Sequence, residues 1–221
     1  MAGKVFFAVT MSLDGFIAPV PDVTVGEVFA PGGQDDPRVQ RWLRKWSELQ
    51  SWVFPQRFFR ENLKLGEGGA EGLDNDLSKA TYERTGVSVM GKRMFDGGER
   101  AWPEEAPFHT PVFVVTHTER DPWERPGGTT FHFVNDGIES ALLLARDAAG
   151  DRDVRIAGGA DLIQQYLNSG LVDEFSISLA PVLLGTGIRL FDQIDADRIA
   201  LTQVRSEATE VTHLTYTATK R

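Results

Sequence analysis

Four short segments of the sequence carry residue types that suit phosphate or small-ligand binding. In one of them the predicted strand from Val154 to Ala157 ends at Gly158-Gly159 and passes directly into a helical pattern that begins at Ala160. Glycines at such a junction let phosphate oxygens approach the free backbone N–H groups at the positive end of a helix. The spacing is not G-x-G-x-x-G, so a tight strand-to-helix turn without a ligand remains an alternative.

The second segment, Val89 to Arg93, is an apolar strand pattern that ends in Gly91 and two cations. Lys92 and Arg93 suit a pyrophosphate or a 2′-phosphate, and the alternative is two surface cations at a helix start. Gly86 to Lys92 also matches G-x-x-x-x-G-K, the beginning of a P-loop. Arg93 replaces the hydroxyl residue that would bind magnesium, and the intervening residues favour a strand, so a P-loop ATPase is not expected.

The other two segments also lie where predicted strands end. Thr116, His117 and Thr118 offer two hydroxyls and an imidazole, which suit a phosphate or a ribose, although a polar loop has the same composition. The segment Ser12 to Ile17 contains Asp14, which could orient a ligand or relay a proton. Asp-Gly is equally typical of a turn that needs a positive φ.

Composition narrows the function classes. The 221 residues include 32 Asp and Glu against 23 Lys and Arg, a net charge of −9, and no cysteine. A disulfide framework, a thiol nucleophile and a Cys-ligated metal site are therefore ruled out. No pair of the four histidines has a metal-ligand spacing, so no metal is expected. G-x-S-x-G is absent, so a hydrolase triad has no anchor.

Nucleic acid and membrane are not expected as partners. The stretch Arg38 to Lys64 has seven Lys and Arg among aromatics, but Trp42 and Trp46 share the apolar face of a predicted helix, which explains them as packing residues. No apolar run approaches the roughly 20 residues of a membrane span. The apolar stretch near the N-terminus is too short for a signal peptide, so we expect a cytoplasmic protein.

The elements that must position these segments alternate between strands and helices. Helix patterns cover about 37–49, 75–84, 137–149 and 160–169, with Asp36 as the N-cap of the first and Asp136 as that of the third. Gly86 is expected to close the second. Eight strands are predicted, at 4–10, 87–90, 112–116, 130–134, 154–157, 174–180, 199–206 and 211–219. The last two are separated by four residues and predict an antiparallel hairpin.

This order predicts an α/β protein with a mixed, mostly parallel sheet and an antiparallel edge. We expect a single domain over residues 1–221. The segment at about 19–86 interrupts the rhythm and is interpreted as an elaboration of the core.

Taken in order, the motifs resemble the dihydrofolate reductase-like family, on the branch of the riboflavin-biosynthesis reductase (RibD C-terminal) domain, here as a stand-alone protein. The resemblance rests on SLDGFIA at 12–18, VMGKR at 89–93, VVT at 114–116, IAGG at 156–159 and LAPVLLGTG at 179–187. It implies a three-layer α/β/α fold with a mixed sheet of about eight strands, and NADPH as the hydride donor.

The resemblance also implies roles for individual residues. The phosphates of the cofactor would lie by Gly91, Lys92 and Arg93, and its 2′-phosphate by Thr116, His117 and Thr118. The pyrophosphate would be cradled by Ala157, Gly158, Gly159 and Ala160. The far wall would be formed by Leu183, Leu184 and Gly185. Nicotinamide and substrate would border on Ser12, Leu13, Gly15 and Phe16. Asp14 is the candidate catalytic residue.

The expected activity is NADPH-dependent hydride transfer, similar to that of 5-amino-6-(5-phosphoribosylamino)uracil reductase. The substrate would be a small pteridine- or pyrimidine-like heterocycle or a carbonyl compound, and a homodimer is expected by family analogy. Riboflavin synthesis itself is not expected, because the zinc-deaminase signature is absent and no ribose-phosphate contacts can be placed. Two alternatives stay open: an NADP(H)-binding protein without turnover, and a dihydrofolate reductase proper, which would need a carboxylate in its substrate pocket.

Overall fold

The structure is a computed structural model that describes residues 3–20 and 23–221. Residues 1–2 and 21–22, which belong to the predicted N-terminal segment and to the elaborated segment, lie outside the described residues. The strands are β1 Val5–Ser12, β2 Phe16–Ala18, β3 Thr85–Gly91, β4 Val112–Val115, β5 Trp123–Arg125, β6 Thr129–Val134, β7 Asp153–Gly158, β8 Glu174–Ala180, β9 Ile188–Arg189, β10 Ile199–Ala208 and β11 Thr212–Lys220. The α-helices are α1 Val25–Val28, α2 Pro37–Leu49, α3 Arg57–Asn62, α4 Leu73–Arg84, α5 Lys92–Ala101, α6 Ile138–Ala149 and α7 Ala160–Asn168.

Nine strands form one sheet in the order β10-β11-β8-β1-β7-β3-β4-β6-β5, and β2 pairs with β9 beside it. The strands from β8 to β6 in this order are parallel, whereas β11, β10 and β5 are antiparallel to their neighbours. This is the predicted mixed, mostly parallel sheet, closed at one side by the predicted hairpin. Parallel strands point their carboxyl ends to one edge of the sheet, and that edge collects the loops that follow them.

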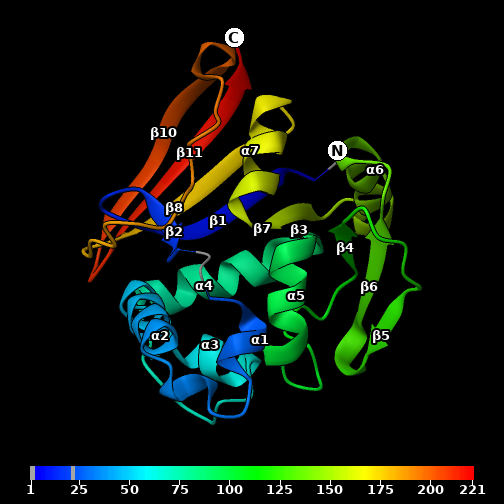
Figure 1. Cartoon of the computed structure of the whole chain (residues 1–221). Coiled ribbons are helices and arrows are strands. Elements are labelled where there is room, and N and C mark those ends of the chain that lie inside the picture. Colours follow the sequence, from blue (N-terminus) through cyan, green and yellow to red (C-terminus); the bar gives the residue numbers. More distant parts are fainter. Residues whose placement is uncertain (1–2, 21–22) are drawn as a thin grey trace.

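Helices cover both faces of the sheet, so the fold has the predicted three α/β/α layers (Figure 1). One face, here the α6/α7 face, packs alternate strand residues such as Phe7, Val89 and Ile156 against α6 and α7. Tyr166 of α7 is fully buried there, and its hydroxyl donates to the carbonyl of Ile138 at 2.8 Å. The other face, here the α2–α5 face, packs Met90, Val112 and Val114 against Phe95 of α5, among others.

The segment 19–86 supplies much of the helical layer on the α2–α5 face (Figure 1). Asp36 caps α2 as predicted, because its side chain accepts a hydrogen bond from the N–H of Arg38 at 2.8 Å. After α2 the chain turns over β1, where the indole N–H of Trp52 donates to the hydroxyl of Thr10 at 3.1 Å. The elaborated segment is therefore packed on the sheet and closes one side of the core.

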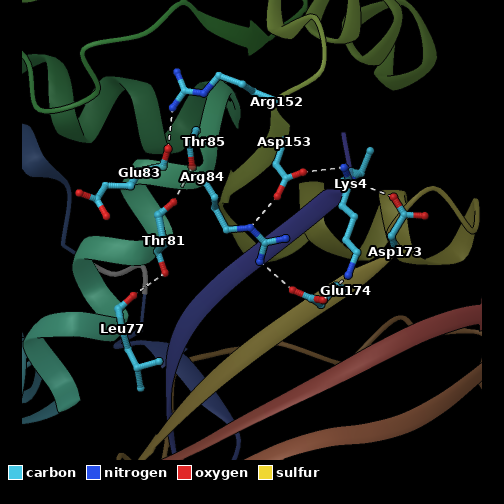
Figure 2. A network of polar contacts seen from close by, with 11 residues as sticks. Lys4, Leu77, Thr81, Glu83, Arg84, Thr85, Arg152, Asp153, Asp173 and Glu174 are labelled. Carbon is cyan, nitrogen blue, oxygen red and sulfur yellow. Dashed lines mark hydrogen bonds and ion pairs between the residues drawn. The ribbon is translucent and has the colours of Figure 1, made fainter. Parts of the chain in front are cut away.

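At the amino ends of the parallel strands, two carboxylates and two cations hold β1, β7 and β8 together (Figure 2). Arg84, at the end of α4, donates to Asp153 at 2.6 Å and to Glu174 at 2.7 Å, and Glu174 also accepts from Lys4 at 2.7 Å. The guanidinium lies 4.1 Å from the centre of the Phe6 ring. Burial alone would raise the pKa of Glu174, but hydrogen bonds from Lys4 and Arg84 outweigh it and hold that pKa below its ordinary value.

Three local predictions are corrected. The described residues form eleven strands, which are the eight predicted ones and three more. The additional strands β2, β5 and β9 were missed because they are only two or three residues long and carry no readable alternation. Gly86 does not end a helix, since α4 runs directly into β3. The N-cap of α6 is Gly137, not Asp136, whose carboxylate instead accepts from the hydroxyl of Ser140 at 2.9 Å.

Candidate active site

The predicted site segments all follow parallel strands and meet at the carboxyl edge of the sheet (Figure 1). The register places Met90 of β3 beside Gly158 of β7, and Ser12 of β1 beside Ala180 of β8. Gly91 pairs with Val115, which is the residue before the Thr116 loop. The topology therefore brings to one edge the segments 12–16, 91–93, 116–118, 157–160 and 183–185.

Two helix N-termini lie next to each other at this edge. The helix α5 starts at Lys92 directly after β3, and α7 starts at Ala160 after the neighbouring strand β7. Their N-caps, Gly91 and Gly159, have no side chain that could accept a hydrogen bond from the first helical N–H groups. Unsatisfied N–H groups and the positive end of the helix dipole favour an anion at each terminus.

The glycines leave this edge accessible. A Cβ atom added to Gly159 would meet no heavy atom within 4 Å, and one added to Gly91 would lie 3.8 Å from the Cβ of Leu162. Gly158 has a φ of +125°, a conformation that favours glycine, and the peptide bond between Gly158 and Gly159 is cis. Phosphate oxygens could thus reach the backbone N–H groups of α7 without displacing a side chain. The cradle fits the phosphates of a dinucleotide on this observation.

The polar residues predicted around the phosphates differ in how they are held. The ammonium group of Lys92 pairs with Asp96 one turn along α5, whereas Arg93 is exposed and has no ion-pair partner among residues 3–20 and 23–221. The hydroxyl of Thr116 is buried and accepts from the N–H of Thr118 at 3.1 Å, so it shapes the loop. His117 and Thr118 are exposed beside it.

Asp14 ties the loop after β1 to the loop after β8. Its carboxylate accepts from the N–H of Leu184 at 3.1 Å, from the N–H of Gly185 at 2.7 Å and from the hydroxyl of Ser12 at 2.6 Å. Burial would raise its pKa, but the hydrogen bonds from Ser12, Gly185 and Leu184 together lower it. A carboxylate held ionised by three donors suits the positioning of these loops better than proton donation.

Sequence reasoning missed two cations that contact these loops. Arg189 of β9 donates to the carbonyl of Asp14 at 2.8 Å, and its guanidinium lies 4.2 Å from the centre of the Phe16 ring. Lys45 of α2 donates to the carbonyl of Leu184. Both lie far along the chain from their partners and in no local motif, so only the folded arrangement reveals them.

A row of polar side chains, also missed, crosses the α2–α5 face from β1 to β11. Thr10, Ser178 and His213 are cross-strand neighbours in adjacent strands. The imidazole of His213 is buried, with Nδ1 3.0 Å from the hydroxyl of Ser178 and Nε2 2.8 Å from the carboxylate of Asp74. The rings of Trp52 and His213 pack edge to face, with their centres 5.2 Å apart. This row begins two residues before the Ser12 loop.

Two cavities in the described part of the chain lie away from the N-termini of α5 and α7. One of about 240 Å³ lies at the opposite end of the sheet, between the end of α7 and the hairpin β10–β11. A smaller one of about 60 Å³ lies between α2 and Thr186, next to the β8 loop. Within residues 3–20 and 23–221 no three His, Asp or Glu side chains are grouped closely enough to hold a metal ion, and no helix there is long and apolar enough to cross a membrane.

The chain is similar in sequence to proteins of Bacillus subtilis. The chain is 32% identical over 130 residues to YwjB of Bacillus subtilis (strain 168), an uncharacterized protein, which covers 59% of this chain and 71% of YwjB. It is 40% identical over 74 residues to the uncharacterized protein YyaP of the same organism, and this match spans 34% of the chain and only 38% of YyaP.

Solved structures show the same fold. A putative riboflavin biosynthesis protein from Shewanella sp. PV-4 superposes with a TM-score of 0.61 at 22% identity, over 97% of this chain and 98% of that one. Dihydrofolate reductase from Enterococcus faecalis, complexed with NADP(H), superposes with a TM-score of 0.53 at 12% identity, over 100% and 98%. At such identities these structures establish a dihydrofolate reductase-like fold and no more. The model of the RibD C-terminal domain matches residues 70–214, and the chain therefore belongs to the RibD C-terminal domain family.

Proposed function

We propose that the chain is an NADPH-dependent reductase that transfers a hydride to a small heterocyclic or carbonyl substrate. One observation carries the proposal: the uncapped N-termini of α5 and α7 start from neighbouring parallel strands at the same edge as the Asp14 loop. Two adjacent anion sites suit a pyrophosphate and a further phosphate of one dinucleotide. Family membership supports a reductase of this kind.

NADPH, when bound, supplies the hydride, and the chain supplies binding and orientation. The backbone N–H groups after Gly159 and Gly91 would bind phosphate oxygens, and Arg93 would balance the negative charge. Thr116 would hold its loop in shape so that His117 and Thr118 can reach the 2′-phosphate. Asp14, through Leu184 and Gly185, would hold two loops at a fixed distance and thereby fix the wall beside the reacting atoms.

The chain's own proton donor is not assigned to Asp14, because all its hydrogen bonds stabilise the ionised form. In this proposal the proton comes from a water molecule or from another acid near the reacting atoms. The carboxylate of the polar row, Asp74, is bound by His213 and Thr209, which argues against dihydrofolate reductase proper because a free carboxylate is missing from that row.

The test is fluorescence titration of the purified protein with NADPH and NADH, followed by NADPH oxidation with a panel of pterins, pyrimidines and small carbonyl compounds. Saturable binding with preference for NADPH, and turnover of at least one compound, are expected. Absence of saturable binding of either nucleotide would contradict the proposal. Tight NADPH binding without turnover across the panel would support the alternative of a binding protein. The hydrogen bonds that keep Asp14 ionised are consistent with that alternative, because they leave the chain without an assigned proton donor.

A homodimer stays a prediction, and gel filtration with light scattering would test it.

A further inference from the structure

Arg155, a charged side chain on the α2–α5 face, has no counter-ion among the described residues. Arg155 lies in the middle of β7, between the buried residues Phe6 of β1 and Ser88 of β3. Central strands of parallel sheets are normally apolar on both faces, because helices cover them. A guanidinium at this position breaks that rule, and such local departures concentrate at functional sites.

The surroundings of Arg155 leave part of its hydrogen-bonding capacity unused. Its Nε atom is buried and has no hydrogen-bond partner among the described residues, and its guanidinium carbon lies 4.7 Å from the centre of the Tyr82 ring. Stacking on a ring leaves the edge of the guanidinium plane free for acceptors. A buried N–H without an acceptor is unfavourable, and the described residues supply no acceptor for this Nε–H.

The neighbouring Arg84 shows what a structural arginine on this face does. The guanidinium of Arg84 forms ion pairs with the carboxylates of Asp153 at 2.6 Å and Glu174 at 2.7 Å (Figure 2). Asp153 lies two residues before Arg155 on the same face of β7, yet its two oxygens accept from Arg84 and from the N–H of Lys4. The acids closest along the strand are therefore occupied, and no residue in 3–20 or 23–221 supplies a hydrogen-bond or ion-pair partner for the Arg155 guanidinium.

The place of Arg155 suits a ligand. Arg155, Ala157 and Ala8 of β1 keep partial solvent exposure, although they lie on central strands of the α2–α5 face. Arg155 precedes Gly158 by three residues, which corresponds to about 10 Å along a strand. A small molecule next to the proposed cofactor site could span that distance.

We infer that Arg155 binds an oxyanion, a carboxylate or a phosphate ester, carried by the substrate. The inference rests on the proposed function only in assigning the oxyanion to the substrate. The planar guanidinium would donate two parallel hydrogen bonds to the oxyanion, while Tyr82 covers one of its faces. Arg155 thereby selects acidic substrates over neutral ones of the same shape.

The test uses the whole 221-residue chain without cofactor. The readout is the Arg155 Nε–H signal in nitrogen–proton correlation spectra, identified by its loss in Arg155→Lys. Benzoate and inorganic phosphate are titrated separately, with benzamide as the neutral match of benzoate. We expect a saturable shift of the Arg155 signal with at least one of the two anions and none with benzamide, while the Arg84 signal stays in place. Benzoate alone would indicate a carboxylate substrate, and phosphate alone a phosphate ester.

Variants give a second measurement. Isothermal titration calorimetry, which does not depend on the Arg155 signal, measures anion affinity in the variants. Arg155→Gln should weaken binding of that anion by about tenfold to a hundredfold, Arg155→Lys should retain part of it, and Arg146→Gln on the exposed side of α6 should not change it. No saturable shift with either anion, or equal affinity in Arg155→Gln, overturns the inference. Because no nucleotide is present, this result is independent of NADPH binding, which the earlier titration decides separately.

Discussion

The carboxylate of Asp14 accepts a hydrogen bond at 2.7 Å from the backbone N–H of Gly185, a residue 171 positions further along the chain. The same carboxylate also accepts from Leu184, and Arg189 donates to the carbonyl of Asp14. The loops after β1 and β8 are thus joined at the edge where the proposed hydride transfer takes place. Asp14, the candidate catalytic residue of the sequence analysis, therefore also connects two loops in the structure.

Asp14→Asn should loosen this connection. The amide has one acceptor oxygen in place of two, so at least one of the three hydrogen bonds is lost, and we expect a loss of about 1–2 kcal/mol in the free energy of unfolding. Urea denaturation measures that loss. NADPH oxidation should slow while the pH profile of kcat keeps its shape. A profile that loses one ionisation in Asp14→Asn would instead identify Asp14 as a proton donor.

Gly159→Val tests the phosphate cradle. The backbone of Gly159, with φ −77° and ψ −167°, accepts a β-branched residue, and its Cβ would enter open space. Stability should fall by no more than about 1 kcal/mol, whereas NADPH affinity should drop about tenfold or more, because the side chain covers the N–H groups of α7. Ala148→Val, at an exposed position of α6, adds similar bulk and should leave NADPH affinity unchanged. Equal NADPH affinity in Gly159→Val and the unmodified protein would remove α7 from the cofactor site.

The network around Arg84 should make stability depend on pH. The pKa of Glu174 is lower in the folded chain than in the unfolded one, so the unfolded state binds the proton more readily. Its contribution is full above about pH 4.3, the ordinary glutamate value, and is lost as the pH falls through the lower folded pKa.

Glu174→Gln should therefore cost about 1–3 kcal/mol at neutral pH and make thermal unfolding less sensitive to acid. The melting temperature measured across the acidic range checks both effects. Glu119→Gln, at an exposed position without an ion-pair partner in the described part of the chain, is the control and should follow the unmodified protein. Parallel melting curves for Glu174→Gln and the unmodified protein would contradict this account.

Much of the fold is readable in the sequence because its strands are long, apolar and marked by turns. β8 was predicted with its actual ends, and the hairpin β10–β11 followed from two β-rich runs with a short connection. The short strands and the helices α3 and α5 were not predicted, since their residues acquire their conformation from tertiary packing. Gly98 of α5, for example, lies against the ring of Trp102.

The candidate site was predictable only in part, because some of its residues are defined by contacts between distant parts of the chain. Segments at strand ends are local motifs, and the topology brings them together. Arg189 and Lys45 lie in none of the four site segments, and Arg155 lies in one of them only as a strand residue. Their roles depend on their surroundings, which are the Phe16 ring, the Leu184 carbonyl and, for Arg155, the lack of a hydrogen-bond acceptor among the described residues. Such residues emerge only when contacts between distant parts of the chain are known.

Arg93→Gln tests the preference for NADPH over NADH. Arg93 is exposed at the start of α5 and its charge is not balanced by an ion pair with any described residue, whereas Lys92 is paired with Asp96. If Arg93 faces the 2′-phosphate, its loss should weaken NADPH binding by about tenfold and leave NADH binding nearly unchanged, because NADH lacks that group. Fluorescence titration with both nucleotides measures the ratio. Equal weakening of both would place Arg93 at the pyrophosphate, and no weakening of either would move the nucleotide away from α5.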